Sequence, residues 1–274
     1  MSKAILITGC SSGIGYDAAT TLHTRDWRVF ATCRQEADCQ RLRNEGLESF
    51  RLDYADEESL ESAVAEVEQR TGGSLDALFN NGAYALPGAV EDIPRAGLRA
   101  IFEVNLFGQF DLINRCLPML RASSRPRVVN CSSVLGLAAI PFRGAYTATK
   151  FGMEALTDTL RRENRRGPVR FILIEPGPIA TRMRENARRH FEQWIDWQNS
   201  SKRELYEKYL RPRLYGTEKV RDRFELLPAA VTRKLLHAIE SRRPRHRYFV
   251  TAPTYFASFV TRFLPTAWQD AILS

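Results

Sequence analysis

The sequence has few cysteines and histidines, and neither residue type occurs in a metal-binding pattern. Five cysteines and four histidines are scattered over 274 residues. An odd number of cysteines cannot pair completely, and zinc sites use closely spaced pairs of these residues. We therefore expect free thiols, a reducing and cytoplasmic location, and no metal site.

Long apolar runs and biased segments are also missing. No uncharged stretch reaches the roughly 18 residues that a bilayer-spanning helix needs. The apolar stretch near the N-terminus has only about six residues, which is too short for a signal peptide. Hydrophobic residues make up 44% and charged residues 26%, a composition typical of a globular protein.

Negative charge is in deficit, with 32 acidic against 40 basic residues and a net charge of +8. A basic surface can attract phosphate, nucleic acid or anionic lipid, or it can simply be a solvated, arginine-rich surface. No nucleic-acid-reading motif accompanies the charge, so we expect no nucleic-acid partner.

Apolar segments alternate with amphipathic ones along most of the chain. The expected strands are 4–7, 27–32, 48–52, 75–79, 127–131, 169–174 and 248–250. The expected helices are 14–25, 36–45, 56–71, 95–120, 144–165 and 228–241. Repeated strand–helix units predict an α/β fold, a doubly wound parallel sheet in one domain over 1–274. The charged, aromatic-rich region 182–225 departs from this pattern, and we expect it to form a helical substrate lid.

A glycine-rich segment, residues 8–15, follows the first expected strand and opens the first expected helix. Gly9 allows a tight turn, Gly13 lets the backbone approach a pyrophosphate, and Gly15 lets helix and strand pack closely. Free N–H groups at the helix N-terminus then attract negative charge. This context favours a dinucleotide site over a structural turn.

A second group of residues points to acid–base chemistry. Tyr146 and Lys150 lie four positions apart, on one face of the helix expected over 144–165. Alone, such a pair is usually an exposed surface pair. Here Ser133 follows the fifth expected strand, thirteen positions before Tyr146, and Asn105 lies on the long helix expected before it.

Together with the G-x-x-x-G-x-G spacing, these residues resemble the short-chain dehydrogenase/reductase family over about 1–185, closest to its hydroxysteroid and retinol dehydrogenase branch. The resemblance implies that Tyr146 transfers the proton and that Ser133 binds the substrate oxygen. It implies that Lys150 holds the nicotinamide ribose and lowers the tyrosine pKa, and that Asn105 holds a relay water.

The resemblance therefore predicts an enzyme. Reducing a carbonyl needs a hydride, which a nicotinamide supplies, and a proton, which the protein supplies. We expect an oxidoreductase that interconverts a carbonyl and an alcohol on a small substrate. The alternative is a non-catalytic NADP-binding sensor or partner protein on the same fold.

The end of the second strand predicts NADP rather than NAD. Arg34 stands where an NAD-binding protein has an acidic residue, and a guanidinium can pair with the 2′-phosphate. Ser11 and Ser12 could add hydroxyl donors. Arg34 could instead be an ordinary surface arginine. By resemblance Asp53 contacts the adenine, but it could equally be a turn residue.

Further cofactor contacts are implied by the family pattern alone. They are Ile14 in the glycine loop, Asn80 after the fourth strand, and Pro176, Gly177, Ile179 and Thr181 after the sixth. Ile179 would offer its backbone to the carboxamide, and Thr181 its hydroxyl to the carboxamide or phosphate. Residues 80–83 read Asn-Asn-Gly-Ala, whereas the family usually shows Asn-Asn-Ala-Gly. The backbone path at Asn80 is therefore less certain to follow the family.

Aromatic residues dominate the candidate substrate pocket and favour a lipophilic substrate. The candidates are Tyr84, Leu135, Phe142, Met183, Phe191, Trp194, Trp197, Tyr206 and Tyr209. Aromatics at helical spacing are more often core residues than pocket residues, so each assignment alone is weak.

The carboxy-terminal segment 253–274 is aromatic and follows a basic run at 242–247. Such a segment can contact an anionic membrane or pack on the protein. We favour packing, because Pro265 limits any helix and the apolar run is short. From the resemblance we also expect a homodimer or homotetramer, paired through the helices at 95–120 and 144–165.

Overall fold

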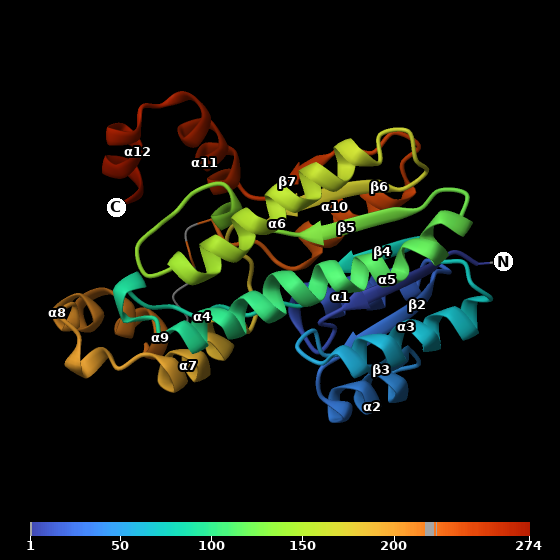
Figure 1. The fold of residues 1–274 in the computed structure, drawn as a ribbon, viewed down its shortest axis with the longest axis horizontal. Helices are drawn as coiled ribbons and strands as arrows, with labels where there is room; N and C mark the ends of the chain where they lie inside the picture. Colours follow the sequence, from blue (N-terminus) through green and yellow to red (C-terminus); the bar gives the residue numbers. More distant parts are fainter. Residues whose placement is uncertain (1, 217–221, 223) are drawn as a thin grey trace.

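The computed structural model describes residues 2–216, 222 and 224–274, and its centre is a seven-stranded parallel sheet (Figure 1). The strand order is β3-β2-β1-β4-β5-β6-β7. The strands are β1 (Ala4–Thr8), β2 (Arg28–Cys33), β3 (Glu48–Arg51), β4 (Ala77–Asn80), β5 (Arg127–Cys131), β6 (Arg170–Glu175) and β7 (Arg247–Phe249). The order reverses between β1 and β4, which confirms the doubly wound fold.

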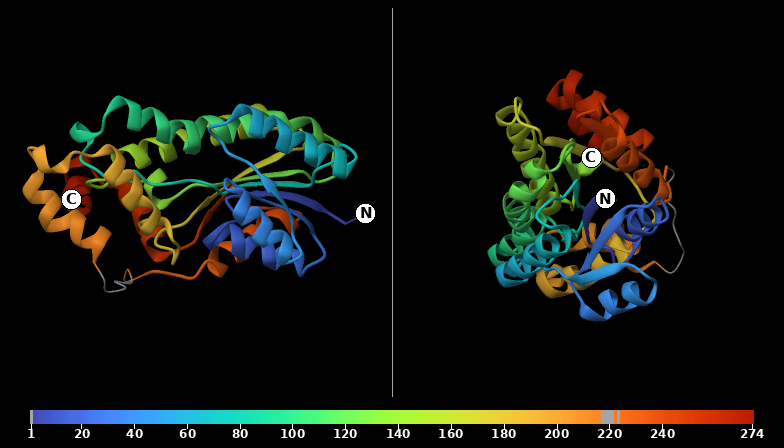
Figure 2. Two further views of the ribbon diagram at one scale, coloured as in Figure 1. Left: turned by 90° about the horizontal axis from the view of Figure 1, so that it is seen from below. Right: turned by 90° about the vertical axis from the view of Figure 1, so that its right-hand side faces the viewer.

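Helices cover both faces of the sheet (Figure 2). One face carries α1 (Gly13–His23), α2 (Glu36–Asn44) and α10 (Ala229–Glu240), and the other carries α3 (Glu57–Thr71), α5 (Gly108–Ala122) and α6 (Gly144–Glu163). Each expected helix therefore forms, with ends that shift by a few residues.

Two apolar cores lie on opposite sides of the sheet, and β1 contributes to both. Ile5 and Ile7 point into the core beneath α1, whereas Ala4 and Leu6 point into the core beneath α3 and α5. Side chains alternate along a strand, so a strand buried on both faces must be apolar throughout. All five cysteines are buried free thiols, as expected.

The long helix expected over 95–120 is not uniform. It begins as α4 (Arg95–Phe102), continues through a π-helical turn at Glu103–Phe107, and resumes as α5. Asn105 lies inside this π turn. A π turn inserts an extra residue into the helix and often marks a functional position.

The lid is helical and extends beyond the carboxyl ends of the strands (Figure 2, left). It contains α7 (Met183–Trp194), α8 (Arg203–Leu205) and α9 (Arg211–Tyr215). Tyr206 anchors it, because its buried hydroxyl donates to Asp92 Oδ2 at 2.6 Å and accepts from the Ala89 N–H at 2.8 Å. Part of the expected lid, 217–221 and 223, lies outside the described residues.

The carboxy-terminal segment forms two helices, α11 (Ala252–Phe263) and α12 (Thr266–Leu273), on either side of Pro265. Ala257 and Val260 are buried, so α11 packs on the protein as favoured. Its outer side exposes several aromatic residues: Tyr255, Phe256, Phe259, Phe263 and, on α12, Trp268. Among the helices described, none is both long and apolar enough to cross a bilayer.

Candidate active site

The glycine loop between β1 and α1 has the tight geometry that a dinucleotide requires. Gly9 and Gly13 have positive φ angles of 69° and 61°, a region that favours glycine. A Cβ on Gly15 would lie 2.4 Å from the Gly9 carbonyl oxygen. The loop and the start of α1 thus pack too closely for any side chain at Gly15, as the sequence predicted.

The altered Asn-Asn-Gly-Ala segment packs directly against this loop. Asn81 Nδ2 donates to the backbone oxygens of Thr8 and Gly9 at 3.0 and 3.3 Å. A Cβ on Gly9 would lie 2.7 Å from the Gly82 Cα. The glycine at position 82 therefore stands where the two loops are in close contact, and Asn81 fixes that contact.

The Asn80 side chain is directed into the protein. It is fully buried, donates to Asn130 Oδ1 at 3.0 Å, and accepts a hydrogen bond from the Tyr54 hydroxyl at 2.9 Å. Only the backbone of Asn80 is left to contact a cofactor. Its side chain instead joins β4 to β5.

The surface beyond β2 combines two guanidinium groups with the glycine loop. Arg34 is exposed and has no hydrogen bond or ion pair to any described residue. Arg41, which sequence reasoning missed, donates to the Ser11 carbonyl oxygen at 2.8 Å. The Ser12 hydroxyl makes no capping bond at the start of α1 and is available to a ligand. These groups suit a phosphate.

Asp53 has a local structural role. Its Oδ1 accepts the Ala55 N–H at 3.1 Å, the hydrogen bond of a short aspartate turn after β3. The helix cap of α3 is Asp56, which accepts the Ser59 N–H at 3.1 Å. A contact from Asp53 to adenine remains a prediction.

The loop after β6 faces the glycine loop. The residues on either side of Ile179 bond to Leu226, at 2.9 and 3.1 Å, in an isolated parallel bridge. This pairing does not use the N–H and C=O of Ile179 itself, which therefore stay available to a carboxamide. The Thr181 side chain lies 3.0 Å from a Cβ built on Gly13, so the two loops are neighbours.

Pro176 and Gly177 hold this loop to its surroundings. The Pro176 carbonyl oxygen accepts the Val134 N–H at 2.7 Å. A Cβ on Gly177 would lie 2.1 Å from Thr251 Oγ1. Both residues thus fix the loop to the turn after β5 and to the start of α11.

Tyr146, Lys150 and Ser133 come together at the carboxyl ends of β5 and β6. Lys150 is buried, its Nζ donates to the Cys131 carbonyl oxygen at 2.8 Å, and it lies 5.6 Å from the centroid of the Tyr146 ring. The Ser133 hydroxyl lies near the phenol of Tyr146 and acts to lower its pKa. It also accepts the Leu135 N–H at 3.1 Å.

Comparison with known proteins places this geometry in a family. Residues 3–192 match the profile of the short chain dehydrogenase family. The chain belongs to the short-chain dehydrogenases/reductases. It is therefore a member of an oxidoreductase family, as the sequence motifs predicted.

Two relatives match the chain over nearly its whole length. An uncharacterized oxidoreductase of Escherichia coli K12, YbbO, is 36% identical over 273 residues, covering 100% of this chain and 94% of the relative. Mouse retinol dehydrogenase 16 is 35% identical over 279 residues, covering 99% and 87%. The expected kinship with retinol dehydrogenases is thus confirmed.

Solved structures share the fold at lower identity. A family member from Burkholderia phymatum in complex with NAD superposes with a TM-score of 0.76 at 24% identity, covering 94% of this chain and 91% of that one. An alcohol dehydrogenase from Thermococcus sibiricus, complexed with 5-hydroxy-NADP, gives 0.70 at 21% identity, with coverage of 92% and 97%. These structures bind different cofactors, so they do not distinguish NADP from NAD for this chain.

Burial dominates the ionisation of the two central groups. Burial raises the pKa of Tyr146 above its ordinary value, while the Ser133 hydrogen bond and the positive charge of Arg143 act in the opposite direction. Burial also lowers the pKa of Lys150 to about 8, against the opposing charge of Glu154. The expected effect of Lys150 on the tyrosine pKa is not among these causes; the charge of Arg143 is.

Asn105 ties the catalytic helix to the loop after β4. Its Nδ2 donates to the Tyr84 carbonyl oxygen at 2.8 Å, and its Oδ1 accepts the Tyr84 N–H at 3.0 Å. The same amide lies 3.4 Å from Thr149 Oγ1 on α6. Both polar atoms of the Asn105 side chain are therefore already bonded to Tyr84, and a relay water at this residue stays a prediction.

The candidate pocket residues fall into three groups: partly buried residues around Tyr146, fully buried core residues, and exposed residues of the lid. Seven belong to the same apolar cluster as Tyr146, and five of these are partly buried: Tyr84, Leu135, Phe142, Trp194 and Trp197. Phe191 and Tyr206 are fully buried core residues, whereas Met183 and Tyr209 are exposed on the lid. The surroundings of Tyr146 are therefore apolar and largely aromatic.

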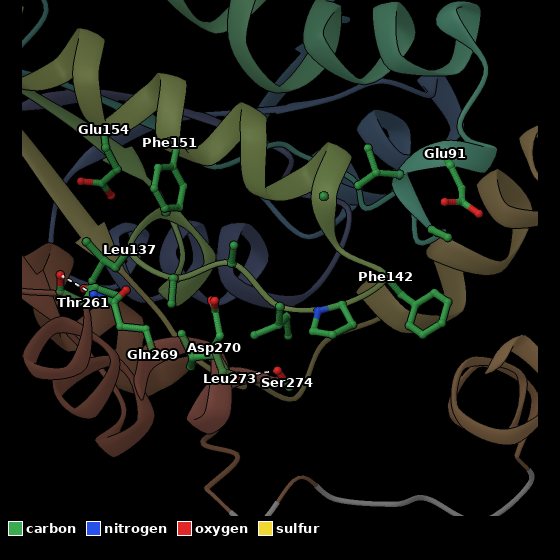
Figure 3. A pocket seen from close by; sticks show the side chains of 18 of the residues that line it. Glu91, Leu137, Phe142, Phe151, Glu154, Thr261, Gln269, Asp270, Leu273 and Ser274 are labelled. Atoms are coloured by element: carbon green, nitrogen blue, oxygen red, sulfur yellow. Dashed lines mark hydrogen bonds between the residues drawn. The ribbon is translucent and has the colours of Figure 1, made fainter. Parts of the chain in front are cut away.

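A cavity of about 940 Å³ lies between α6, the segment 136–142 and the carboxy-terminal helices (Figure 3). Phe151 and Glu154 of α6 line one side, and Leu273 lies toward the other (Figure 3). The described residues that line it do not include Tyr146. Phe142, which packs in the cluster of Tyr146, and Gly144 do line it.

Proposed function

We propose that this protein is an NADP-dependent oxidoreductase that interconverts a carbonyl and an alcohol on a small, largely apolar substrate. The observation that carries the proposal is the convergence of the Tyr146 phenol, the Ser133 hydroxyl and the Lys150 ammonium beside one another. The family relationship and the aromatic cluster around Tyr146 support it.

The residues present fit a dinucleotide. The glycine loop has no room for side chains at Gly9 and Gly15, and no described residue bonds to the backbone of Ile179. Lys150 Nζ has one oxygen acceptor among the described residues, so it retains protons for ribose hydroxyls. When bound, the nicotinamide supplies or accepts the hydride.

The protein then has to handle one proton and one developing negative charge. Tyr146 donates the proton to the carbonyl oxygen, and takes it back in the reverse direction. Ser133 donates a hydrogen bond to the same oxygen and stabilises its charge in an apolar, water-poor setting. Lys150 orients the ribose, and the positive charge of Arg143 acts to lower the pKa of the phenol.

The preference for NADP rests on the surface beyond β2. Arg34 has no partner among the residues that the structure describes, and Arg41 is held against the glycine loop through Ser11. Arg34, which stands where an NAD-binding protein has an acidic residue, favours a 2′-phosphate, whereas Arg41 already pairs with Glu45 at 2.8 Å. Measuring kcat/KM for NADPH and NADH in Arg34→Asp tests this, and an unchanged preference would remove Arg34 from the argument.

The proton role is tested by Tyr146→Phe, with Tyr255→Phe on α11 as the matched control. We expect the substitution at Tyr146 to lower turnover at least about 100-fold while NADPH binding stays close to normal. Turnover is followed as NADPH oxidation over a panel of aldehydes and ketones. A normal rate in Tyr146→Phe would refute the mechanism. Tight NADPH binding without turnover of any compound by the wild type would support a non-catalytic NADP-binding protein instead.

We also propose that the protein forms a homodimer or homotetramer through α5 and α6. Phe107, directly before α5, and Leu156 on α6 are exposed apolar residues of these helices. Light scattering of the wild type and of Leu156→Glu tests it. A monomer at micromolar concentration in the wild type would contradict the proposal.

A further inference from the structure

Arg143 occupies an unusual position directly before the catalytic helix. It is the N-cap residue of α6, one helical turn before Tyr146, and its side chain makes no capping hydrogen bond. The N-terminus of a helix carries partial positive charge, so a cation is unfavourable there and an acceptor side chain is preferred. Helix capping therefore does not explain why an arginine occupies this position.

The backbone that presents Arg143 is strained. Phe142, immediately before it, has a φ of 61°, a region that a bulky residue rarely adopts. Two contacts hold Phe142 there. Its carbonyl oxygen accepts the Gly88 N–H at 3.0 Å, and its ring lies 5.2 Å from that of Tyr206 in the lid. Strain of this kind is often found at ligand-binding segments.

The Arg143 guanidinium is partly buried and has no hydrogen-bond or ion-pair partner in the part of the chain that the structure describes. Burial, together with the positive charges of Arg213 and Arg184, lowers the pKa of Arg143 to about 10. The group nevertheless stays charged at neutral pH. A buried charge without a partner is costly, so an anion that bound there would be favoured.

The part of the lid that the structure describes forms no ion pair with Arg143. Asp222 is the carboxylate near Arg143, and it already pairs with Arg184 at 3.1 Å and with Arg213 at 2.8 Å. Asp222 is thus already paired with two other guanidinium groups, while the charge of Arg143 acts on the phenol of Tyr146. Among the described residues, this part of the site has more positive than negative charge, beside the apolar cluster around Tyr146.

We propose that the substrate carries a carboxylate, which Arg143 binds while the reacting carbonyl lies at Tyr146. The proposal rests on the proposed oxidoreductase function and narrows its substrate class to amphipathic oxo acids. A carboxylate fits because a guanidinium can donate two parallel hydrogen bonds to it. The apolar walls formed by Leu135, Trp194 and their neighbours would contact the hydrocarbon part.

The cofactor phosphates do not explain Arg143 equally well. Their binding groups lie at the glycine loop, at Thr181 and beyond β2, whereas Arg143 lies at the start of α6, beside the lid. An anion at Arg143 therefore belongs on the substrate side of Tyr146. Arg143→Gln should leave the Kd for NADPH within about twofold of the wild type, which also checks that the variant folds.

The test compares a medium-chain ω-oxo carboxylic acid with its own methyl ester. The two compounds share the aldehyde and the hydrocarbon chain. The ratio of their kcat/KM values therefore measures the effect of the carboxylate charge alone. We expect the wild type to prefer the acid by at least about tenfold, the value of a charge-assisted hydrogen bond. We expect the ratio to fall to about one in Arg143→Gln and to be partly retained in Arg143→Lys.

The control is Arg189→Gln, which removes the same charge from the exposed side of α7 and should preserve the wild-type ratio. Equal use of acid and ester by the wild type would overturn the inference while leaving the oxidoreductase function intact. Turnover of neither compound, nor of any neutral aldehyde or ketone, would count against the function itself. A fall of the ratio in Arg189→Gln as large as in Arg143→Gln would show a general field effect and also overturn the inference.

A second measurement needs no variant. Decanoate and decanamide have the same chain length, and only decanoate is charged. We expect decanoate to inhibit wild-type reduction of a neutral aldehyde at least about tenfold more strongly than decanamide. Equal inhibition by the two compounds would contradict a carboxylate site at Arg143.

Discussion

Replacing Glu175 by glutamine should remove a specific part of the pH dependence of stability. Glu175 ends β6 and is completely buried. It accepts hydrogen bonds from Arg247 Nη1 at 2.7 Å and from the Tyr248 N–H at 3.2 Å. Arg247 is shared with two further carboxylates, those of Glu154 and Asp158. The Arg247 guanidinium therefore pairs with three carboxyl groups. If all three were ionised, negative charge would exceed positive charge around Arg247.

The direction of the effect follows from the pKa. Burial, and secondly the charge of Glu154, raise the pKa of Glu175 from 4.5 to about 8, although Arg247 opposes this. The folded state thus retains a proton that the unfolded state releases. The resulting stability is fully present below about pH 4.5 and is lost as the pH rises through about 8. Between about pH 6.5 and about pH 8.5 the loss amounts to about 2 kcal/mol.

Urea unfolding at these two pH values measures the effect. The free energy of unfolding of the wild type should fall by about 2 kcal/mol more than that of Glu175→Gln. Lys150, whose pKa burial lowers to about 8, acts in the opposite direction in this range. Both proteins contain Lys150, so its contribution cancels in the difference.

The matched control is Glu58→Gln on the exposed side of α3. The free energy of unfolding of Glu58→Gln should change between the two pH values by the same amount as that of the wild type. If Glu175→Gln also follows the wild type, Glu175 is ionised at neutral pH in the folded protein. The assignment of a retained proton to this carboxyl would then be wrong.

Two further substitutions test the cofactor loop and the lid. Gly15→Ala places a Cβ 2.4 Å from a backbone oxygen of the loop and should weaken NADPH binding at least about tenfold in a fluorescence titration, whereas Gly167→Ala, whose Cβ would come no closer than 3.4 Å to any atom of Asn164, should not. Equal affinity of both variants would mean that the loop can rearrange. Tyr206→Phe leaves the Asp92 carboxylate without its 2.6 Å donor and should cost about 1–3 kcal/mol in urea unfolding, whereas Tyr209→Phe on the exposed side of the lid should cost little. A cost below about 0.5 kcal/mol for Tyr206→Phe would show that this bond does not hold the lid.

The sheet could be predicted because it is buried on both sides. A strand such as β1 must be apolar at every position when Ile5 and Ile7 face one core and Leu6 faces the other. Continuous apolar runs separated by helical patterns leave few topologies, and the right-handed crossover rule selects among them. The glycine loop is a local feature of the same kind, since Gly15 is required by a contact with Gly9 and Gly9 itself has a positive φ.

The π turn at Asn105 could not be predicted in this way. An extra residue in a helix turn shifts the apolar face only slightly, so the segment 95–120 still reads as one helix. The reason for the turn lies far away in the sequence, at Tyr84, whose backbone N–H and C=O both bond to the Asn105 side chain. Such a reciprocal bond depends on tertiary structure and leaves no periodic pattern.

The role of Arg143 could be predicted in part, because the sequence contains one signal that points to it. A helix beginning at 144 should have serine, threonine, aspartate or asparagine before it, and an arginine there opposes the helix dipole. What the sequence cannot show is that Phe142 adopts a positive φ, or that Asp222 is already occupied by Arg184 and Arg213. An unfavourable cap residue indicates that the position serves a function other than capping. The positive charges packed around Arg143 indicate that this function is to bind an anion. The amphipathic substrate class therefore follows only when the local rule and the tertiary structure are considered together.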